Sequence, residues 1–166
     1  MSAQANPQFA LRPFLAEDAS TVAQIFQAAI AELTSDDYSE AQQEAWASVA
    51  DDVADFAAKL GGQLTLVATL DGEPAGFASL AGKDKIDMLY VHPDAAGQGA
   101  AATLADALEK LAAARGADKL TVDASDTARG FFEHRGYVAQ SRNSISIGDE
   151  WLANTTLTKQ LKGANP

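Results

Sequence analysis

A glycine-rich turn between an apolar stretch and an alanine-rich stretch could bind an anion through the backbone. Residues 86–91 are strand-like, and Gly97, Gln98 and Gly99 then lead into a long helix expected over 98–115. Glycine allows a tight bend and the close approach of a ligand, and the first N–H groups of a helix have no acceptor within it. Lysine and arginine are absent between Val91 and Glu109. A phosphate at this turn would therefore be held by N–H groups and the helix dipole.

Two other phosphate-binding motifs fit the residues around this turn poorly. A dinucleotide-binding unit would need an acidic residue about 20 residues later, after a second strand. Here Asp118 and Asp123 come only after a long helix. A P-loop would need Gly-Lys followed by Ser or Thr, which the chain lacks.

A second segment, residues 119–138, predicts a strand, a short helix that begins near Ser125 or Asp126, and a stop at Gly136. Over about 87–137, the two segments resemble motif A and the following strand and helix of the GNAT superfamily of acyl-CoA-dependent N-acetyltransferases, in a bacterial branch of undefined substrate. The family pattern is Val-x-Pro, then Gln/Arg-x-x-Gly-x-Gly/Ala and a helix, and later Asn-x-x-Ala-x-x-apolar-Tyr-x-x-x-Gly-Phe. Three positions depart from it: Ala96 opens the phosphate loop, Ser125 replaces Asn, and Phe132 replaces the tyrosine thought to protonate the departing thiolate.

The resemblance implies an α+β fold, an α/β three-layer sandwich. Its mixed, mostly antiparallel sheet of about seven strands would splay between strands four and five, with about four flanking helices. Residue patterns predict helices over about 17–33, 39–60 (one or two), 98–115 and 127–135. Strands are expected at 9–13, 64–70, 75–80, 86–91, 120–124, 137–140 with 143–147, and 151–158, and Asp71-Gly72 is expected to turn the second and third of these into a β-hairpin. Residues 1–8 read as a disordered leader, 9–162 as one GNAT domain and 163–166 as a tail.

Composition narrows the function classes. The 166 residues include no cysteine, which excludes disulfides, thiolate metal sites and a cysteine nucleophile. The net charge of −11 argues against nucleic acid and anionic membranes as partners. The sequence contains no apolar run of bilayer length and no signal peptide, which predicts a cytoplasmic protein.

The resemblance also implies acetyl-CoA as co-substrate and no metal. Pantetheine amides would pair with the backbone of Leu89 and Val91, and the stretch from Gly97 to Ala102 would hold the diphosphate. Ser125 is expected either to hydrogen-bond the pantetheine arm or to cap the following helix. The small residues that open the long helix also suit plain helix propensity. The full set of expected coenzyme contacts is Leu89, Tyr90, Val91, Gly97, Gln98, Gly99, Ala100, Ala101, Ala102, Ser125, Ala128 and Phe132.

Asp87 is the candidate general base, because it is a carboxylate on an otherwise apolar strand and alternates with Leu89 and Val91. The alternatives are a structural pairing of Asp87 with Lys85 or a backbone group, and a water chain in place of a single base. Tyr90 is a candidate acid in place of Phe132, although the thiolate could also leave unassisted. His92 is expected at a surface turn.

The acceptor pocket is expected from the first two helices and their link, with Phe26, Tyr38 and Trp46 as its walls. These aromatic walls would suit an apolar or aromatic amine, and Asp36 or Asp37 could attract its charge. The alternative is that these aromatic residues form core or dimer contacts. A homodimer could form through the strands around Ile145 and Trp151.

The predicted function is transfer of an acetyl group from acetyl-CoA to a primary amine of a small molecule or peptide, by direct attack in a ternary complex. One alternative is a non-catalytic acyl-CoA sensor or regulatory subunit, which Ala96 and Phe132 favour. The other is a protein-interaction module with an acidic face.

Overall fold

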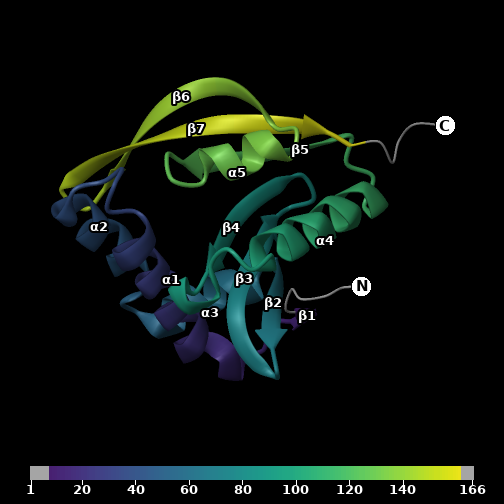
Figure 1. Cartoon of the computed structure of the whole chain (residues 1–166), viewed down its shortest axis with the longest axis horizontal. Coiled ribbons are helices and arrows are strands. Elements are labelled where there is room, and N and C mark those ends of the chain that lie inside the picture. Colours follow the sequence, from purple (N-terminus) through teal and green to yellow (C-terminus); the bar gives the residue numbers. More distant parts are fainter. Residues whose placement is uncertain (1–7, 162–166) are drawn as a thin grey trace.

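A twisted sheet of seven strands organises residues 8–161, the part of the chain that the computed structural model describes (Figure 1). The strand order is β1-β2-β3-β4-β5-β7-β6, and all neighbours are antiparallel except β4 and β5. The strands are β1 (Ala10–Pro13), β2 (Leu64–Leu70), β3 (Glu73–Ala81), β4 (Lys85–Val91), β5 (Lys119–Ser125), β6 (Val138–Ile147) and β7 (Glu150–Gln160). The predicted mixed sheet is confirmed.

Five α-helices cover this sheet in the described residues, and the residue patterns allowed four or five. They are α1 (Ala19–Leu33), α2 (Glu40–Ala47), α3 (Val53–Gly61), α4 (Ala100–Ala114) and α5 (Arg129–His134). The stretch predicted as one or two helices over 39–60 contains α2 and α3, each with its own cap. Ser39 accepts from the Gln42 N–H, and Asp52 accepts from the Asp55 N–H. Residues 1–7 of the predicted leader and the predicted tail 163–166 lie outside the described residues.

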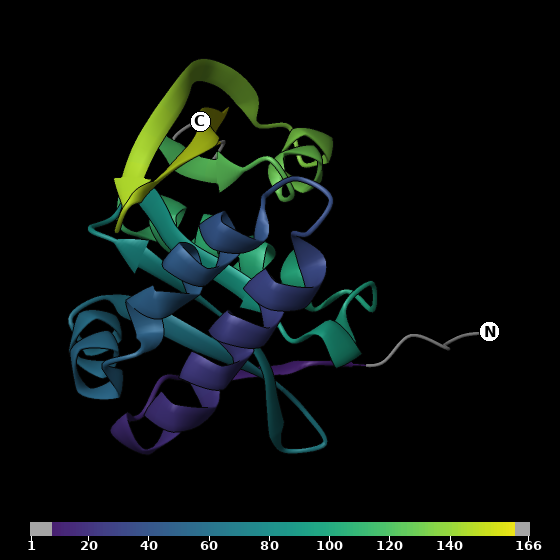
Figure 2. The same cartoon turned by 90° about the vertical axis from the view of Figure 1, so that its left-hand side faces the viewer.

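The two faces of the sheet carry separate apolar clusters, which gives the predicted three layers. Helices α1 and α3 pack Phe26 and Phe56 against Phe77 of β3 and Met88 of β4. On the other face, α4 and α5 pack their apolar side chains against β3, β4 and β5. Figure 2 shows α1, α2 and α3 together in front of the sheet.

A buried carboxylate fixes α4 to the end of the chain. Glu109 of α4 has a side chain only 11% exposed and accepts from Arg135, Tyr137 and Lys159 at 2.9–3.2 Å. Burial alone would raise the pKa of Glu109, but the hydrogen bonds from these three residues outweigh it and hold the pKa below 4.5. The charged form of Glu109 therefore ties α4 to α5 and β7.

Strands β4 and β5 separate, as predicted. They pair only at Lys85 with Thr121 and at Ile86 with Val122, so residues 87–91 of β4 have no partner on β5. The rest of β5 pairs with β7 on its other side. The opening between β4 and β5 therefore lies in the middle of the sheet, between the two helical layers (Figure 1).

Candidate active site

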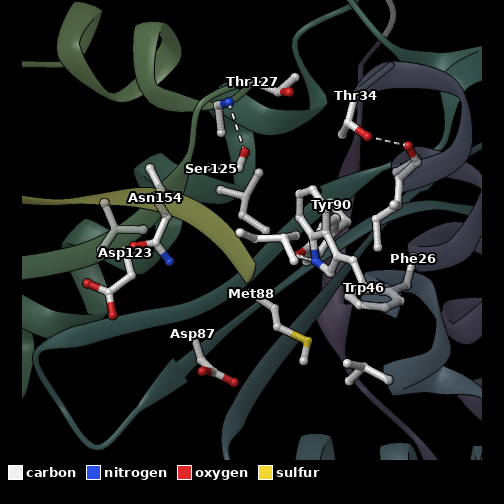
Figure 3. Close-up of a pocket in the computed structure, with 18 of the residues that line it drawn as sticks. Phe26, Thr34, Trp46, Asp87, Met88, Tyr90, Asp123, Ser125, Thr127 and Asn154 are labelled. Carbon is white, nitrogen blue, oxygen red and sulfur yellow. Dashed lines mark hydrogen bonds between the residues drawn. The ribbon is translucent and has the colours of Figure 1, made fainter. Parts of the chain in front are cut away.

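A cavity of about 420 Å³ lies where β4 and β5 separate. Most of the predicted site residues line it, although they come from α1, α2, β4, β5 and α5 and the loops between them (Figure 3). They are Phe26, Tyr38, Trp46, Asp87, Leu89, Tyr90, Val91, Ser125, Ala128 and Phe132. The stretch from Gly97 to Ala102 does not line this cavity, so the predicted diphosphate loop and the predicted pocket are separate surfaces.

The free edge of β4 presents backbone groups toward the opening. The His92 N–H donates to the Ala75 carbonyl on the β3 side at 2.8 Å. Because successive residues of a strand turn their backbone polar groups in opposite directions, Leu89 and Val91 direct theirs away from β3. This is the side from which β5 has separated. The backbone groups of Leu89 and Val91 therefore face the gap between β4 and β5, and their pairing with pantetheine stays a prediction.

The turn before α4 leaves several N–H groups unpaired. Gly97 and Gly99 have φ of +77° and +99°, and a Cβ added at either would meet nothing within 4 Å. The carbonyl of Gly99 accepts from the N–H and hydroxyl of Thr103. Among residues 8–161, the N–H groups of Ala100, Ala101 and Ala102 make no hydrogen bond. These N–H groups form the candidate anion site. The helix starts two residues later than predicted, because the left-handed conformation of Gly99 cannot belong to a helix.

Asp87 lies at a β-bulge, which corrects its expected orientation. Ser79 of β3 pairs with Met88 and Leu80 pairs with Ile86, so Asp87 is an extra residue with no partner on β3. A bulge interrupts the alternation of side chains between faces. Asp87 accordingly contacts α3 and the second residue after it, at 3.5 Å from Lys59 Nζ and 3.1 Å from Gln63 Nε2. The expectation that Asp87 shares the face of Leu89 and Val91 was wrong.

Lys85 does not pair with Asp87, although the sequence analysis considered that pairing as an alternative. Lys85 lies 3.1 Å from Asp123 of β5, which also accepts from the Thr156 hydroxyl at 2.6 Å. Burial opposes ionisation of Asp123, but these two partners outweigh it and lower its pKa. Asp87 is thus paired with Lys59, and Asp123 with Lys85.

Tyr90 is surrounded by aromatic rings beside Asp87. Its ring centroid lies 4.7 Å from that of Phe26 and 5.8 Å from that of Phe77, and its hydroxyl accepts from Trp46 Nε1 at 3.2 Å. Burial raises the pKa of Tyr90 strongly, and the Asp87 charge adds to this effect. Tyr90 is therefore protonated at neutral pH, and no acceptor for its hydroxyl hydrogen is found in the described part of the chain.

Two predicted site hydroxyls hold loops in place. The Tyr38 hydroxyl donates to the Ala153 carbonyl at 2.6 Å and accepts from the Asp126 N–H at 2.9 Å. Burial raises the pKa of Tyr38. The Ser125 oxygen accepts from the Ala128 N–H at 3.1 Å, so it caps the turn that leads into α5 (Figure 3). Ser125 therefore bonds within the turn before α5, whereas the N-cap of the helix itself is Ala128, which has no side-chain cap.

Sequence reasoning missed part of the cavity lining. Lys59 of α3, residues of β6 and β7, and apolar residues at the ends of α1 and α2 also line it. They are Lys59, Leu33, Val49, Ile145, Ile147, Leu152 and Asn154. No motif marks these residues, because they reach the cavity only through long-range packing. Trp151, expected at a dimer contact, is 64% exposed, and a homodimer stays a prediction.

Two classes of feature are absent from residues 8–161. None of the helices there has the length and apolar character needed to cross a bilayer. In the same residues, no three His, Asp or Glu side chains gather closely enough to hold a metal ion.

Comparisons with known proteins agree with this architecture. The family model for the acetyltransferase (GNAT) domain matches residues 34–152. The uncharacterised N-acetyltransferase YafP of Escherichia coli K12 is 32% identical over 144 residues, which are 87% of this chain and 91% of YafP. The crystal structure of a GCN5-related N-acetyltransferase from Rhodopseudomonas palustris is 65% identical, with a TM-score of 0.94 over 96% of this chain and 100% of that one.

A more distant solved structure, which contains a bound coenzyme, has the same fold. The PaiA N-acetyltransferase of Thermoplasma acidophilum, in complex with coenzyme A, is 16% identical and has a TM-score of 0.76. The similarity covers 92% of this chain and 99% of that one.

Proposed function

The chain belongs to the GNAT acetyltransferase family, and from this premise we propose that it transfers an acetyl group from acetyl-CoA to a primary amine in a ternary complex. The observation that carries the proposal is the separation of β4 from β5, which leaves backbone groups of β4 free beside a cavity that contains Asp87 and Tyr90. Such a gap can accept an extended amide-bearing ligand in place of the missing strand pairing.

The coenzyme would bind to backbone groups of the protein. Its pantetheine amides would pair with Leu89 and Val91 along the edge of β4, and its diphosphate would accept from the N–H groups of Ala100, Ala101 and Ala102. Both interactions use donors that are unpaired in the described residues, and the positive end of the α4 dipole favours the negative charge.

The chemistry needs a proton acceptor and a fixed geometry. The amine nitrogen attacks the thioester carbon, an N–C bond forms, and the C–S bond breaks. Asp87 takes the proton from nitrogen, directly or through one water. N–H groups on the free edge of β4 are donors for the developing oxyanion. The Tyr90 hydroxyl supplies a proton to the departing sulfur, a role that Phe132 has no group to perform.

The test is acetyl-CoA binding by calorimetry, followed by a screen of amines and lysine peptides with thiol release as the readout. We expect binding and thiol release with at least one acceptor. Binding without thiol release from any acceptor would instead identify a non-catalytic acyl-CoA sensor. Failure to bind coenzyme A would contradict both functions and leave the protein-interaction module.

A further inference from the structure

Three exposed apolar side chains from separate elements line the cavity. Leu33 at the end of α1, Val49 just after α2 and Ile145 on β6 are 39%, 42% and 38% exposed, and all three line the cavity. Only six large apolar side chains among residues 8–161 are exposed, and half of them line this cavity. Exposed apolar side chains that converge on a concave site indicate an apolar ligand.

Aromatic rings also line this cavity and contact one another. Trp46 lies edge-on to Tyr38 at 5.3 Å and to Tyr90 at 6.3 Å, and Phe26 lies edge-on to Tyr90 at 4.7 Å. All four side chains line the cavity (Figure 3 labels three of them). Aromatic side chains favour flat apolar ligands, which can stack on them or meet their edges.

The charges of the cavity are already paired. Its only charged lining residues are Lys59, Asp87 and Asp123, all within the described part of the chain. Asp87 pairs with Lys59 at 3.5 Å, and Asp123 pairs with Lys85 at 3.1 Å. The net charge of −11 therefore does not place an unpaired carboxylate in this cavity. An ammonium group that entered it would lose hydration without gaining a free counter-ion.

These three observations together select the chemistry of the acceptor. Resting on the acetyl transfer proposed above, we propose that the acceptor is a primary arylamine, a flat apolar molecule whose amino nitrogen is uncharged at neutral pH. Its free lone pair attacks the thioester carbon without prior loss of a proton. The N–C bond forms as the C–S bond breaks, Asp87 receives the proton released from nitrogen, and the sulfur receives one from Tyr90.

A pair of isomeric amines tests the charge of the acceptor. 4-Ethylaniline and 2-phenylethylamine contain the same atoms, but only the second is a cation at neutral pH. We expect kcat/KM for 4-ethylaniline to exceed that for 2-phenylethylamine, and also that for spermidine, by about tenfold or more. Equal values for the isomers, or a preference for spermidine or a lysine peptide, would overturn the inference.

A matched pair of substitutions on β6 tests the location. Ile145→Asp places an unpaired carboxylate at the opening, whereas Val138→Asp changes a residue that is 62% exposed and outside the cavity lining. Ile145→Asp should raise KM for 4-ethylaniline about tenfold and lower KM for 2-phenylethylamine. Val138→Asp should leave both values unchanged. The same KM for 4-ethylaniline in both variants would overturn the proposed location.

A binding measurement separates failure of this inference from failure of the proposed function. Calorimetry of 4-ethylaniline on the coenzyme A complex needs no turnover. Binding to the parent and to Val138→Asp, but not to Ile145→Asp, would support the arylamine site even if no acceptor releases thiol. Absence of binding to the parent, together with turnover of another amine, would overturn the arylamine site and leave the acetyl transfer intact.

Discussion

The two ends of the ligand site are built from different parts of the chain. At the coenzyme end, the proposed contacts are N–H and C=O groups of β4 and of the first turn of α4. At the acceptor end, they are side chains of α1, α2, β4 and β6. Backbone contacts tolerate many side chains as long as these are small, whereas each side-chain contact depends on one residue type. Coenzyme affinity should therefore depend on the backbone conformation, whereas activity at the acceptor end should depend on single side-chain groups.

The largest expected effect is at Asp87, where the two ends meet. Asp87→Asn keeps the shape of the side chain but removes its capacity to accept a proton. We expect kcat to fall about a hundredfold or more, while Kd for coenzyme A, measured by calorimetry, stays within about twofold because Asp87 lies outside the proposed coenzyme contacts. Asp55→Asn removes a similar charge from α3 and should leave kcat unchanged. If Asp87→Asn lost coenzyme affinity as well as kcat, the coenzyme end and the acceptor end would not be separate.

The next largest effect concerns Glu109, which fixes α4, the helix whose first turn belongs to the coenzyme end. Glu109→Gln removes the charged partner of Lys159 and leaves Arg135 only the more distant Asp106 at 3.6 Å, and breaking a buried ion pair costs about 3 kcal/mol. We expect this loss in the free energy of unfolding, measured in urea at neutral pH. Glu133→Gln removes the exposed ion pair with Arg129 on α5 and should cost less than about 0.5 kcal/mol.

The contribution of Glu109 should also depend on pH. Because its pKa is lowered in the folded state, its stabilisation is fully present above 4.5 and is lost as pH falls through the lowered pKa. The difference in unfolding free energy between the parent and Glu109→Gln should therefore shrink as pH falls below 4.5. A difference that stays constant or grows would show that the charge of Glu109 is not what fixes α4.

A smaller effect tests the backbone character of the coenzyme end directly. Gly99 has φ of +99°, which an alanine adopts only with strain. Gly99→Ala should raise Kd for coenzyme A by about tenfold or more, because it disturbs the N–H groups that follow. Gly116→Ala, at φ of +90° beyond the other end of α4, carries the same strain. Gly116→Ala should lose similar stability but keep coenzyme affinity, and equal affinities in the two variants would argue against the loop.

The smallest effect concerns Ser125. Its oxygen accepts from the Ala128 N–H, so Ser125→Ala removes a hydrogen bond from the turn before α5. We expect the free energy of unfolding to fall by about 1 kcal/mol and KM for acetyl-CoA to rise by less than about threefold, since only a neutral hydrogen bond is at stake. Unchanged stability with a larger rise in KM would instead place the hydroxyl on the pantetheine arm.

The coenzyme end was readable from the sequence because its signals are local. Gly97 and Gly99, the alanine-rich helix after them and the apolar strand before them lie within 30 residues. The hairpin of β2 and β3 was equally readable, since Asp71 and Gly72 both adopt the positive φ that its turn needs. In each case the residue type and the backbone conformation belong to the same few positions.

The acceptor end could be read only in part. Phe26, Tyr38 and Trp46 were expected in the cavity, but Lys59 and Ile145 were not, because strand pairing and helix packing bring them there from distant segments. The orientation of Asp87 was also out of reach. A bulge depends on how β4 aligns with β3, and no residue within β4 marks its position.

The peptide groups at the start of α4 have a consequence for the response to ionic strength. Sites built on lysine and arginine lose affinity for phosphates as salt rises, because salt screens the attraction. Here the proposed donors are uncharged, and the long-range field of a chain with net charge −11 repels a polyanion. Added sodium chloride should therefore leave Kd for coenzyme A unchanged or lower it slightly, and should speed association in stopped-flow experiments. An acidic protein of this kind would capture its anionic coenzyme more readily in concentrated electrolyte than in dilute buffer.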